Sequence, residues 1–417
     1  MENNILEVVI WNRRVGTLQW DTKERRAKFL FYKDFLSSGW DLSPLENSIY
    51  GIHATRGLYI GGNKDKIYAG LPPFIADSLP EHWGNILFKR WAEEEGLSLK
   101  NLTSVDKLAF IGKRGMGALE FIPPTPDIKD KPFDLHVERL YRMAELILDE
   151  RKKTIISNDE IKDLQHLYQV GTSAGGKHSK ALIAIDEKTG KIRSGQVSLP
   201  ASYKYYIIKF AEKDRFPFCE VEYAYYLMAT AAGIEMMPSK LIEAGERNHF
   251  ITERFDRKNG EKIHTQTLAA IRPDVDSYEE LLGVCNALKL PMNEIEQQYR
   301  RMVFNVLAGN VDDHSKNFSF MMDKDGKWHL APAYDITFTI DMDAWSLYNR
   351  HCLTVCGKDD EIKKDDIFAF AKNLGIRNAK RIIEEVEESI KNFRQFAEQA
   401  KVQPQWIDRI DEWLKKD

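Results

Sequence analysis

The chain has 417 residues, of which 43% are hydrophobic and 30% are charged, and its formal net charge is −4. This length supports two or three domains with sizeable cores, and the charge gives no global reason to expect binding to nucleic acid or to a membrane surface. The N-terminus has no basic start followed by an apolar stretch, and no segment reaches the ~18 apolar residues that a membrane span requires. We therefore expect a cytoplasmic protein without membrane contact.

Four cysteines are scattered along the chain: Cys219, Cys285, Cys352 and Cys356. The one close pair has no second pair or histidine at the spacing of zinc ligands. We therefore expect reduced thiols rather than a metal site.

Residues 1–125 are expected to form a β-rich subdomain. Three strand-like segments lie between residues 5 and 32, separated by the polar turns NRR and DTKERR. A helical region follows over residues 70–97, and residues 107–123 end the subdomain with glycine-rich turns and a strand. This part carries no catalytic constellation, so its expected roles are packing and the presentation of a partner surface.

Residues 135–258 are expected to form an α/β nucleotide-binding lobe. A helical pattern over residues 158–168 leads through a strand-like entry into a loop of small residues, 171–176, which includes Gly175 and Gly176. Backbone N–H groups of small residues can surround a phosphate, because no Cβ prevents close approach. A plain hairpin turn requires the same residues, so the loop alone leaves both interpretations open.

An apolar strand over residues 204–210 places Lys209 on one face with Tyr205 and Ile207. A lysine there either reaches solvent at a sheet edge or meets an anion, because an unpaired buried ammonium group is costly. Glu222 in the next helix could be that anion. It could equally be a first-turn acid stabilised by the helix dipole, and we favour this second interpretation.

The segment 249–260 predicts a strand that ends in a turn at Asn259 and Gly260. Residues 259–417 are expected to form a mainly helical lobe whose amphipathic C-terminal helices cover its core. The expected exceptions are a hairpin near residue 320 and a short strand over residues 353–357.

The densest group of polar side chains follows an apolar helical run that ends at Gly309. It occupies eight positions and consists of Asn310, Asp312, Asp313, His314, Lys316 and Asn317. Strands are predicted over residues 318–322 and 328–330, because an Asp-Gly turn separates two apolar segments, and Asp335 follows the second strand.

Asp312, Asn317 and Asp335 have the layout of a protein-kinase catalytic centre. In such a centre one aspartate accepts the proton of the substrate hydroxyl, the asparagine holds a metal, and the later aspartate chelates Mg²⁺ beside the ATP phosphates. A solvated polar turn with Asp313 as a cap is the alternative, since an Asp and an Asn at this separation occur by chance on the order of once in such a chain. The kinase is favoured because the Gly-rich loop, Lys209, Glu222 and this centre follow one another in the order found in protein kinases. In a kinase the strand after the lysine and the helix leads into the hinge that holds adenine, and Glu253 falls there.

The chain also resembles a known family, the HipA-type serine/threonine kinases, which are toxins of bacterial toxin–antitoxin pairs. The motifs that carry the resemblance are WNRRVGTL, FIADSLPEHWGN, GTSAGGKHSKAL, YYIIKF, ERFDR, GNVDDHSKNFSF and APAYDI. The resemblance covers nearly the whole chain. It implies an α+β, two-lobed, protein-kinase-like (phosphatidylinositol-kinase-like) fold, with a small β-rich N-terminal subdomain, a large helical C-terminal lobe and ATP between the lobes.

The resemblance implies roles for individual residues. Asp312 would be the catalytic base, Asn317 and Asp335 would be Mg²⁺ ligands, and Lys209 would contact the phosphates of ATP. The other residues expected around the nucleotide are Gly175, Gly176, Glu253, Phe255, His314 and Tyr334.

The family is known for autophosphorylation of a hydroxyl residue in the Gly-rich loop, which silences the kinase. Thr172 and Ser173 are the candidates here, and the sequence does not choose between them. A phosphate adds a charge of about −1.5 to −2 near the ATP phosphates, so ejection of the loop is physically reasonable.

The resemblance also implies partners. One is a helix-turn-helix antitoxin of the HipB type, through which most contact with DNA would occur, because this sequence shows no DNA-reading motif. The other is a protein substrate, such as an aminoacyl-tRNA synthetase or another translation factor. The basic run 177–179 and Asp313 depart from the family pattern, which leaves the regulation of the loop and the substrate open.

Two other functions compete with the kinase. A metal-dependent phosphohydrolase would use Asp312, Asp313, His314 and Asp335 as a transition-metal centre, but it leaves Lys209 and the Gly-rich loop unexplained. A catalytically inactive kinase-fold module for binding an antitoxin would not need the base and both metal ligands. We therefore expect the ATP- and Mg²⁺-dependent kinase.

Overall fold

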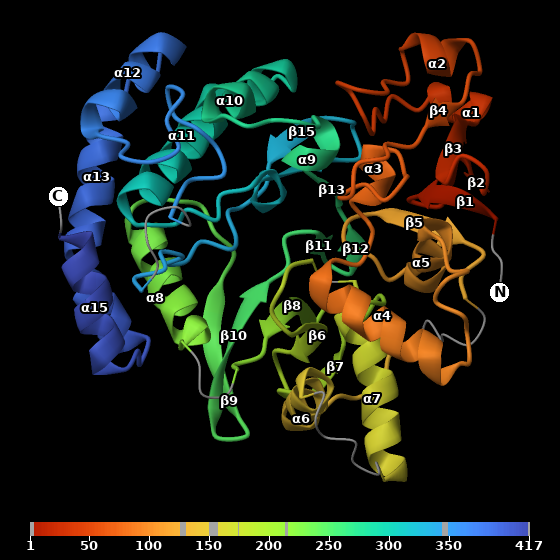
Figure 1. The fold of residues 1–417 in the computed structure, drawn as a ribbon, viewed down its shortest axis with the longest axis horizontal. Helices are drawn as coiled ribbons and strands as arrows, with labels where there is room; N and C mark the ends of the chain where they lie inside the picture. The colour runs from red at the N-terminus through yellow and green to blue at the C-terminus, as the bar shows by residue number, and fades with distance from the viewer. Residues whose placement is uncertain are drawn as a thin grey trace.

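The computed structural model describes residues 4–125, 131–149, 157–173, 175–212, 216–343 and 349–415. Ala174 of the predicted Gly-rich loop lies outside the described residues. No helix within the described ranges is long and apolar enough to cross a membrane. The N-terminal sheet and the C-terminal helices lie on opposite sides of the molecule, and the three other sheets of the described residues lie between them (Figure 1).

The N-terminal part is built on an antiparallel sheet with the order β4-β3-β2-β1-β5. Its strands are β1 (Ile5–Ile10), β2 (Arg13–Asp21), β3 (Arg26–Phe31), β4 (Ile60–Gly61) and β5 (Leu119–Ile122). Its helices are α1 (Lys33–Leu36), α2 (Ile52–Thr55), α3 (Pro73–Ala76), α4 (His82–Glu94) and α5 (Ser104–Ile111). The predicted meander is confirmed, because alternate residues of β3, namely Ala27, Phe29 and Phe31, are buried against the core.

The middle part contains a second antiparallel sheet with the order β7-β6-β8-β10-β9. Its strands are β6 (Lys180–Asp186), β7 (Ile192–Ser194), β8 (Tyr203–Lys209), β9 (Ser239–Ala244) and β10 (Arg247–Glu253). The helices of this part are α6 (Val137–Leu148), α7 (Asn158–Gly171) and α8 (Phe218–Ala231). The strand predicted over residues 204–210 is found as β8, and the strand predicted at the start of the segment 249–260 is found as part of β10.

The strand-like entry to the Gly-rich loop was a wrong prediction, because α7 runs to Gly171 and leads directly into the loop. A capping box between Ser157 and Glu160 starts this helix. Leu164, Leu167 and Tyr168, at helical spacing, are buried in the core beneath the sheet. Packing of that helical face therefore overrides the strand preference of the short segment directly before the Gly-rich loop.

The C-terminal part is mainly helical around a small antiparallel sheet with the order β13-β14-β15. The strands of this part are β11 (Arg257–Lys258), β12 (Glu261–Lys262), β13 (His264–Thr267), β14 (Ser319–Met322) and β15 (Trp328–Leu330). Its helices are α9 (Leu268–Ile271), α10 (Tyr278–Ala287), α11 (Met292–Leu307), η1 (Ser315–Asn317), α12 (Lys364–Leu374), α13 (Ala379–Lys391), α14 (Phe393–Gln399) and α15 (Pro404–Leu414).

Both strands of the predicted hairpin are confirmed as β14 and β15, and α11 ends just before Gly309, whose φ of 69° requires the left-handed region. Residues 353–357 were predicted as a strand, but they make only isolated bridges, with Thr354 pairing to Ser277 and Val355 to Lys358. The α+β class expected from the sequence is confirmed.

The ERFDR motif joins the N-terminal part to the rest of the molecule. Asp256 is fully buried and accepts two hydrogen bonds from Arg254, both 2.8 Å, and one from Arg257, 2.7 Å. It also accepts the Gly117 N–H at 2.7 Å, and Arg257 donates to the Gly115 carbonyl at 3.0 Å. Burial alone would raise the pKa of Asp256, but the two guanidinium groups hold it well below its usual range. The motif therefore acts as a buried clamp between the two parts.

Candidate active site

Lys209 lies at the end of β8 and faces two carboxylates. Its strand lies between β6 and β10, so the interpretation as an edge-strand lysine was wrong. The Lys209 ammonium group is 2.6 Å from Glu222 Oε1 on α8, and it also pairs with Asp335 Oδ1. Burial lowers the pKa of Lys209, but the two carboxylates outweigh that effect and raise the pKa above its ordinary value.

Glu222 was predicted, in the interpretation we favoured, to be a first-turn acid, and this was wrong. The acidic residue in the first turn of α8 is Glu220, whereas Glu222 lies further along the helix, on the buried face that packs against the sheet. Only 6% of Glu222 is exposed to solvent. A buried carboxylate requires a cation or hydrogen-bond donors, and Lys209 provides both.

Lys180 is a residue of this site that the sequence analysis missed. In the register of β6 and β8 it stands directly opposite Lys209, so both side chains leave the same face of the sheet. Lys180 is buried, and its ammonium group donates a hydrogen bond to the Gly175 carbonyl in the Gly-rich loop. Burial lowers its pKa, while Asp335 acts in the opposite direction. Only the strand register, which the sequence did not provide, shows that the two lysines are neighbours.

Asp312 lies on the exposed surface of the loop over residues 310–317, which is called the catalytic loop after its predicted role. Its side chain is 63% exposed, and its backbone N–H donates to Thr339 Oγ1 at 3.2 Å. Asn317, at the other end of the loop, donates from Nδ2 to the Asp312 carbonyl oxygen at 2.7 Å. Partial desolvation and the negative charges of Asp335 and Asp313 raise the pKa of Asp312. The loop thus brings Asp312 and Asn317 together, as the sequence predicted.

Asp335 follows β15 and closes the same site. Its φ of 53° is in the left-handed region, which non-glycine residues adopt infrequently and aspartate more readily than most. Burial would raise the pKa of Asp335, but Lys209 and Lys180 hold it well below its usual range. The carboxylate is therefore charged at neutral pH. Asp335, Asp312 and Asn317 thus come from the two ends of one hairpin.

Asp313, next to Asp312, has an entirely different environment. It is 1% exposed and accepts hydrogen bonds from the Tyr278 hydroxyl at 2.6 Å and the Cys352 N–H at 2.7 Å. The His351 Nδ1 atom lies 2.8 Å from the same carboxylate. The interpretation of the loop as a solvated turn capped by Asp313 was therefore wrong, because this side chain anchors the loop in the core.

This arrangement does not support the transition-metal alternative, which needs Asp313 beside Asp312, His314 and Asp335. Within the described part of the chain, no group of three or more His, Cys, Asp or Glu side chains is placed to hold a metal ion. His314 instead caps the N-terminus of η1, where its Nδ1 accepts the Lys316 N–H at 3.2 Å.

The residues predicted to surround a nucleotide are partly brought together. The Phe255 and Tyr334 rings come from different parts of the chain, and their centroids are 5.7 Å apart. The Tyr334 hydroxyl lies 2.5 Å from Ser319 Oγ and donates to the Lys316 carbonyl at 2.8 Å. Glu253 ends β10, and its N–H donates to the Pro238 carbonyl at 2.9 Å, so this amide already has a partner.

The two loop hydroxyls have different environments. Thr172 is fully buried at the end of α7, and its Oγ1 donates to the Tyr168 carbonyl at 2.5 Å. Ser173 Oγ is also buried, but no hydrogen-bond partner for it is found within the described ranges. Gly176 has a φ of 99°, which only glycine adopts readily.

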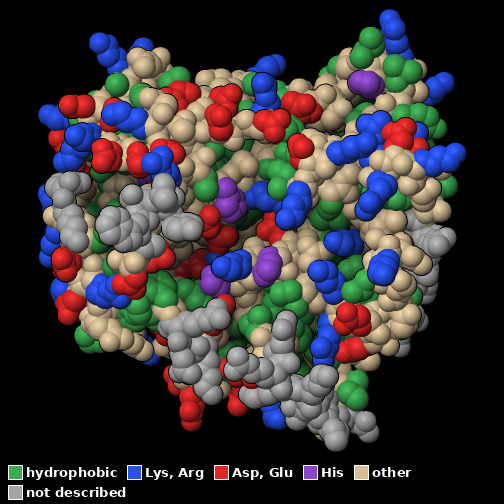
Figure 2. All heavy atoms as spheres, viewed as in Figure 1, with side chains coloured by type: hydrophobic (Ala, Val, Ile, Leu, Met, Phe, Trp, Pro, Cys, Tyr) green, Lys and Arg blue, Asp and Glu red, His purple; other side chains and the backbone are tan. Residues whose placement is uncertain are grey.

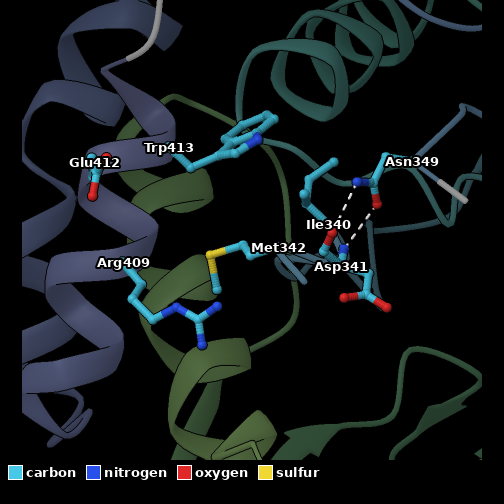
Figure 3. A pocket seen from close by; sticks show the side chains of 7 residues that line it. All are labelled: Ile340, Asp341, Met342, Asn349, Arg409, Glu412 and Trp413. Atoms are coloured by element: carbon cyan, nitrogen blue, oxygen red, sulfur yellow. Dashed lines mark hydrogen bonds between the residues drawn. The ribbon is translucent and has the colours of Figure 1, made fainter. Parts of the chain in front are cut away.

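The molecular surface shows a hollow in the middle of one face (Figure 2). Acidic side chains lie at its bottom, and histidine, lysine and arginine side chains lie along its rim. A second cavity, of about 280 Å³, lies between the segment that follows Asp335 and α15 (Figure 3). It is lined by Ile340, Asp341, Met342, Asn349, Arg409, Glu412 and Trp413. None of the predicted site residues lines it.

Comparison with known proteins gives relatives for most of the chain. A curated protein of Haemophilus influenzae named "Putative kinase" is 32% identical over 152 residues, which are 31% of this chain and 44% of that protein. The "Serine/threonine-protein kinase toxin HipA" of Shewanella oneidensis is 22% identical over 426 residues, covering 92% of this chain and 88% of the relative. The chain thus spans less than half of the first relative and most of the second.

A solved structure shows the same fold. A chain in the complex of HipA, HipB and operator DNA of a Shewanella oneidensis toxin–antitoxin system matches with a TM-score of 0.67 and 18% identity. The match covers 98% of this chain and 95% of that chain. The chain therefore has the two-lobed α+β fold of HipA.

Family models match both parts of the molecule. Residues 6–122 match the HipA N-terminal domain, and residues 172–393, which are more than half of the chain, match the HipA-like C-terminal domain. The second match includes the lysine of β8, the catalytic loop and Asp335. On these matches and on the shared fold, the chain belongs to the HipA family.

Proposed function

We propose that this protein is an ATP- and Mg²⁺-dependent serine/threonine protein kinase and the toxin of a toxin–antitoxin pair. One observation carries the proposal. Lys209 pairs with Glu222 and with Asp335, and Asp335 lines a small cavity together with Asn317, whose side chain donates a hydrogen bond to the Asp312 carbonyl. A strand lysine oriented by a helix glutamate, next to a base and two metal-binding side chains, is the set of groups that phosphoryl transfer in kinases requires.

The donor atoms fit Mg²⁺. Asp335 and Asn317 offer carboxylate and amide oxygens, which are the ligands that this ion prefers. The hydrogen bond from Asn317 Nδ2 to the Asp312 carbonyl fixes the amide plane and turns Oδ1 away from that carbonyl. Bound Mg²⁺–ATP would supply the phosphoryl group and neutralise charge on the phosphates.

Lys209 and Lys180 would bind the phosphates through their ammonium groups, since they stand side by side on one face of the sheet. Glu222 would hold Lys209 in that position through the 2.6 Å ion pair. The exposed carboxylate of Asp312 would accept the proton of a substrate hydroxyl. Partial burial raises its pKa, which makes it a better base than an ordinary aspartate.

We further propose that residues 1–125 contact a partner, that residues 135–258 hold the nucleotide, and that residues 259–417 carry the catalytic loop. The partner would be a helix-turn-helix antitoxin, by analogy with the HipA relative whose structure contains HipB and operator DNA. The substrate would be a protein, such as an aminoacyl-tRNA synthetase or another translation factor.

Self-silencing would occur at Ser173 rather than at Thr172. The Thr172 hydroxyl is occupied by the Tyr168 carbonyl and is buried at the end of a helix, so its phosphorylation would require the last turn of α7 to unfold. Ser173 lies one residue further into the loop, and no such bond within the described residues holds its hydroxyl.

The test is the intact mass of the purified protein after phosphatase treatment and incubation with ATP and Mg²⁺. The parent should gain one phosphate, and Asp312→Ala should gain none while it stays folded. Asp325→Ala, which removes an exposed carboxylate from the hairpin turn, is the matched control and should behave as the parent. Transfer at the parental rate in Asp312→Ala would contradict the proposal, as would the absence of nucleotide binding in the parent.

A further inference from the structure

Glu81 lies where α4, the Gly-rich loop and the catalytic loop meet. It immediately precedes α4 in the N-terminal part. One carboxylate oxygen, Oε2, accepts the N–H of Gly176 in the Gly-rich loop. The other, Oε1, accepts the ammonium group of Lys316 at 2.9 Å. Lys316 belongs to η1 and stands next to Asn317 in the catalytic loop.

The segment around Glu81 is closely fitted to the Gly-rich loop. The Trp83 N–H donates to the Gly176 carbonyl at 3.3 Å, and the Trp83 indole N–H donates to the Lys180 carbonyl at 2.9 Å. A Cβ at Gly175 would lie 3.2 Å from the Glu81 carboxyl group, so a larger residue there would crowd this carboxylate. A Cβ at Gly84 would clash with the Thr172 carbonyl. These contacts hold both ends of the loop against α4.

The charge on Glu81 is maintained by its neighbours. Burial raises the pKa of Glu81, but Lys316, the Gly176 N–H and Lys180 together outweigh that effect and lower the pKa below its ordinary value. The carboxylate is therefore ionised at neutral pH. Lys316 connects it to the catalytic centre, because the Lys316 carbonyl accepts the hydrogen bond of the Tyr334 hydroxyl beside Asp335.

We propose that Glu81 is a positioning residue that holds the Gly-rich loop over the catalytic loop and couples both loops to the N-terminal part of the chain. This inference rests on the proposed kinase function. Glu81 keeps the loop closed through Gly176 and keeps η1 in place through Lys316. Movement of the Gly-rich loop away from the site breaks the hydrogen bond between Gly176 and Glu81. The Glu81 side chain, which still pairs with Lys316, is then less constrained.

The first experiment measures hydrogen–deuterium exchange without nucleotide, and so does not depend on kinase activity. In Glu81→Ala, exchange should accelerate roughly tenfold in residues 171–180 and 312–317, because a hydrogen bond to a charged group is lost in each. Glu81→Gln keeps an acceptor for Gly176 but loses the charge facing Lys316. It should therefore accelerate exchange in residues 312–317 alone. Glu93→Ala, on the exposed face of the same helix, is the control and should match the parent.

Two outcomes of this experiment would overturn the proposal. One is parental exchange of residues 171–180 in Glu81→Ala. The other is uniformly faster exchange over the whole chain, which would mean that Glu81 merely supports general stability. If Glu81→Ala does not fold, Glu81→Gln decides the matter through the selective effect on residues 312–317.

The second experiment separates positioning from chemistry. Glu81→Ala should raise the KM for Mg²⁺–ATP about tenfold and lower kcat much less, because the displaced loop binds the nucleotide. An unchanged KM would overturn the positioning role even if exchange is faster. Binding of a non-hydrolysable ATP analogue to the parent is measured alongside. If the parent does not bind it, the proposed kinase function fails, whereas the exchange result still tests the contact of Glu81 with the two loops.

Discussion

The pair Asp312 and Asp313 allows a sharp test, because two adjacent aspartates should respond to the same substitution in opposite ways. Asp313 is 1% exposed and its carboxylate meets a tyrosine hydroxyl, a histidine ring and a backbone N–H. Asp313→Asn leaves one acceptor oxygen and places an NH₂ group against a donor. Each hydrogen bond to a charged group contributes roughly 1.5–3 kcal/mol, and a disrupted buried pair costs about 3–5 kcal/mol. We expect a loss of about 3 kcal/mol in the free energy of unfolding.

The assay is thermal unfolding, supported by urea titration, in the absence of nucleotide. At ~2–4 °C per kcal/mol for a domain of this size, Tm should fall by about 10 °C in Asp313→Asn. Asp312→Asn changes a side chain that is 63% exposed, so its stability should stay within about 0.5 kcal/mol of the parent while phosphoryl transfer is lost. A Tm for Asp313→Asn equal to that of the parent would refute the assignment of this residue as the anchor of the loop.

Three further predictions concern the ion pair, the pH dependence of stability and the loop. Glu222→Gln should lower kcat/KM for ATP about 10- to 100-fold, because Lys209 loses the charged partner that lies 2.6 Å away. Steady-state kinetics measure this, and an unchanged kcat/KM would contradict the role of the ion pair. Burial lowers the pKa of His264 to about 3, so below pH 6.5 the unfolded chain binds more protons and stability falls. At ~1.4 kcal/mol per pH unit this amounts to about 2 kcal/mol at pH 5, and urea titrations of His264→Phe should show that this part of the dependence is gone. Ser173→Ala should abolish the mass gain with ATP, whereas Thr172→Val should retain it; the reverse pattern would contradict the proposed site.

Several parts of the site could be predicted from local sequence. The periodicity of α11, the glycine that ends it and the Asp-Gly turn of the hairpin are signals within short windows, and they placed Asp312, Asn317 and Asp335 on one loop and one hairpin exit. These residues lie close together because the hairpin between them is short, so their proximity could be predicted from the sequence.

The contacts that cross between elements were harder to predict. Glu222 was predicted to be a first-turn acid stabilised by the helix dipole, because the helix pattern alone does not show that its side chain faces Lys209, 13 residues earlier in the chain. Lys180 was missed because its place opposite Lys209 depends on the register of β6 and β8. The strand-like entry to the Gly-rich loop was wrong because burial of Leu167 and Tyr168 extended α7. Each of these depends on packing against residues distant in sequence.

The sequence by itself determined the kinds of groups available and the order in which they occur, because turns, caps and periodicity act over a few residues. That was sufficient to predict the α+β class and to place Asp312 and Asn317 on one loop, with Asp335 at the exit of the following hairpin. The tertiary structure decided which of two adjacent aspartates enters the core, that Lys209 pairs with Glu222, and that Glu81 reaches both Gly176 and Lys316. Burial and charge pairing are properties of side chains brought together by the whole fold, so no local window of the sequence contains them.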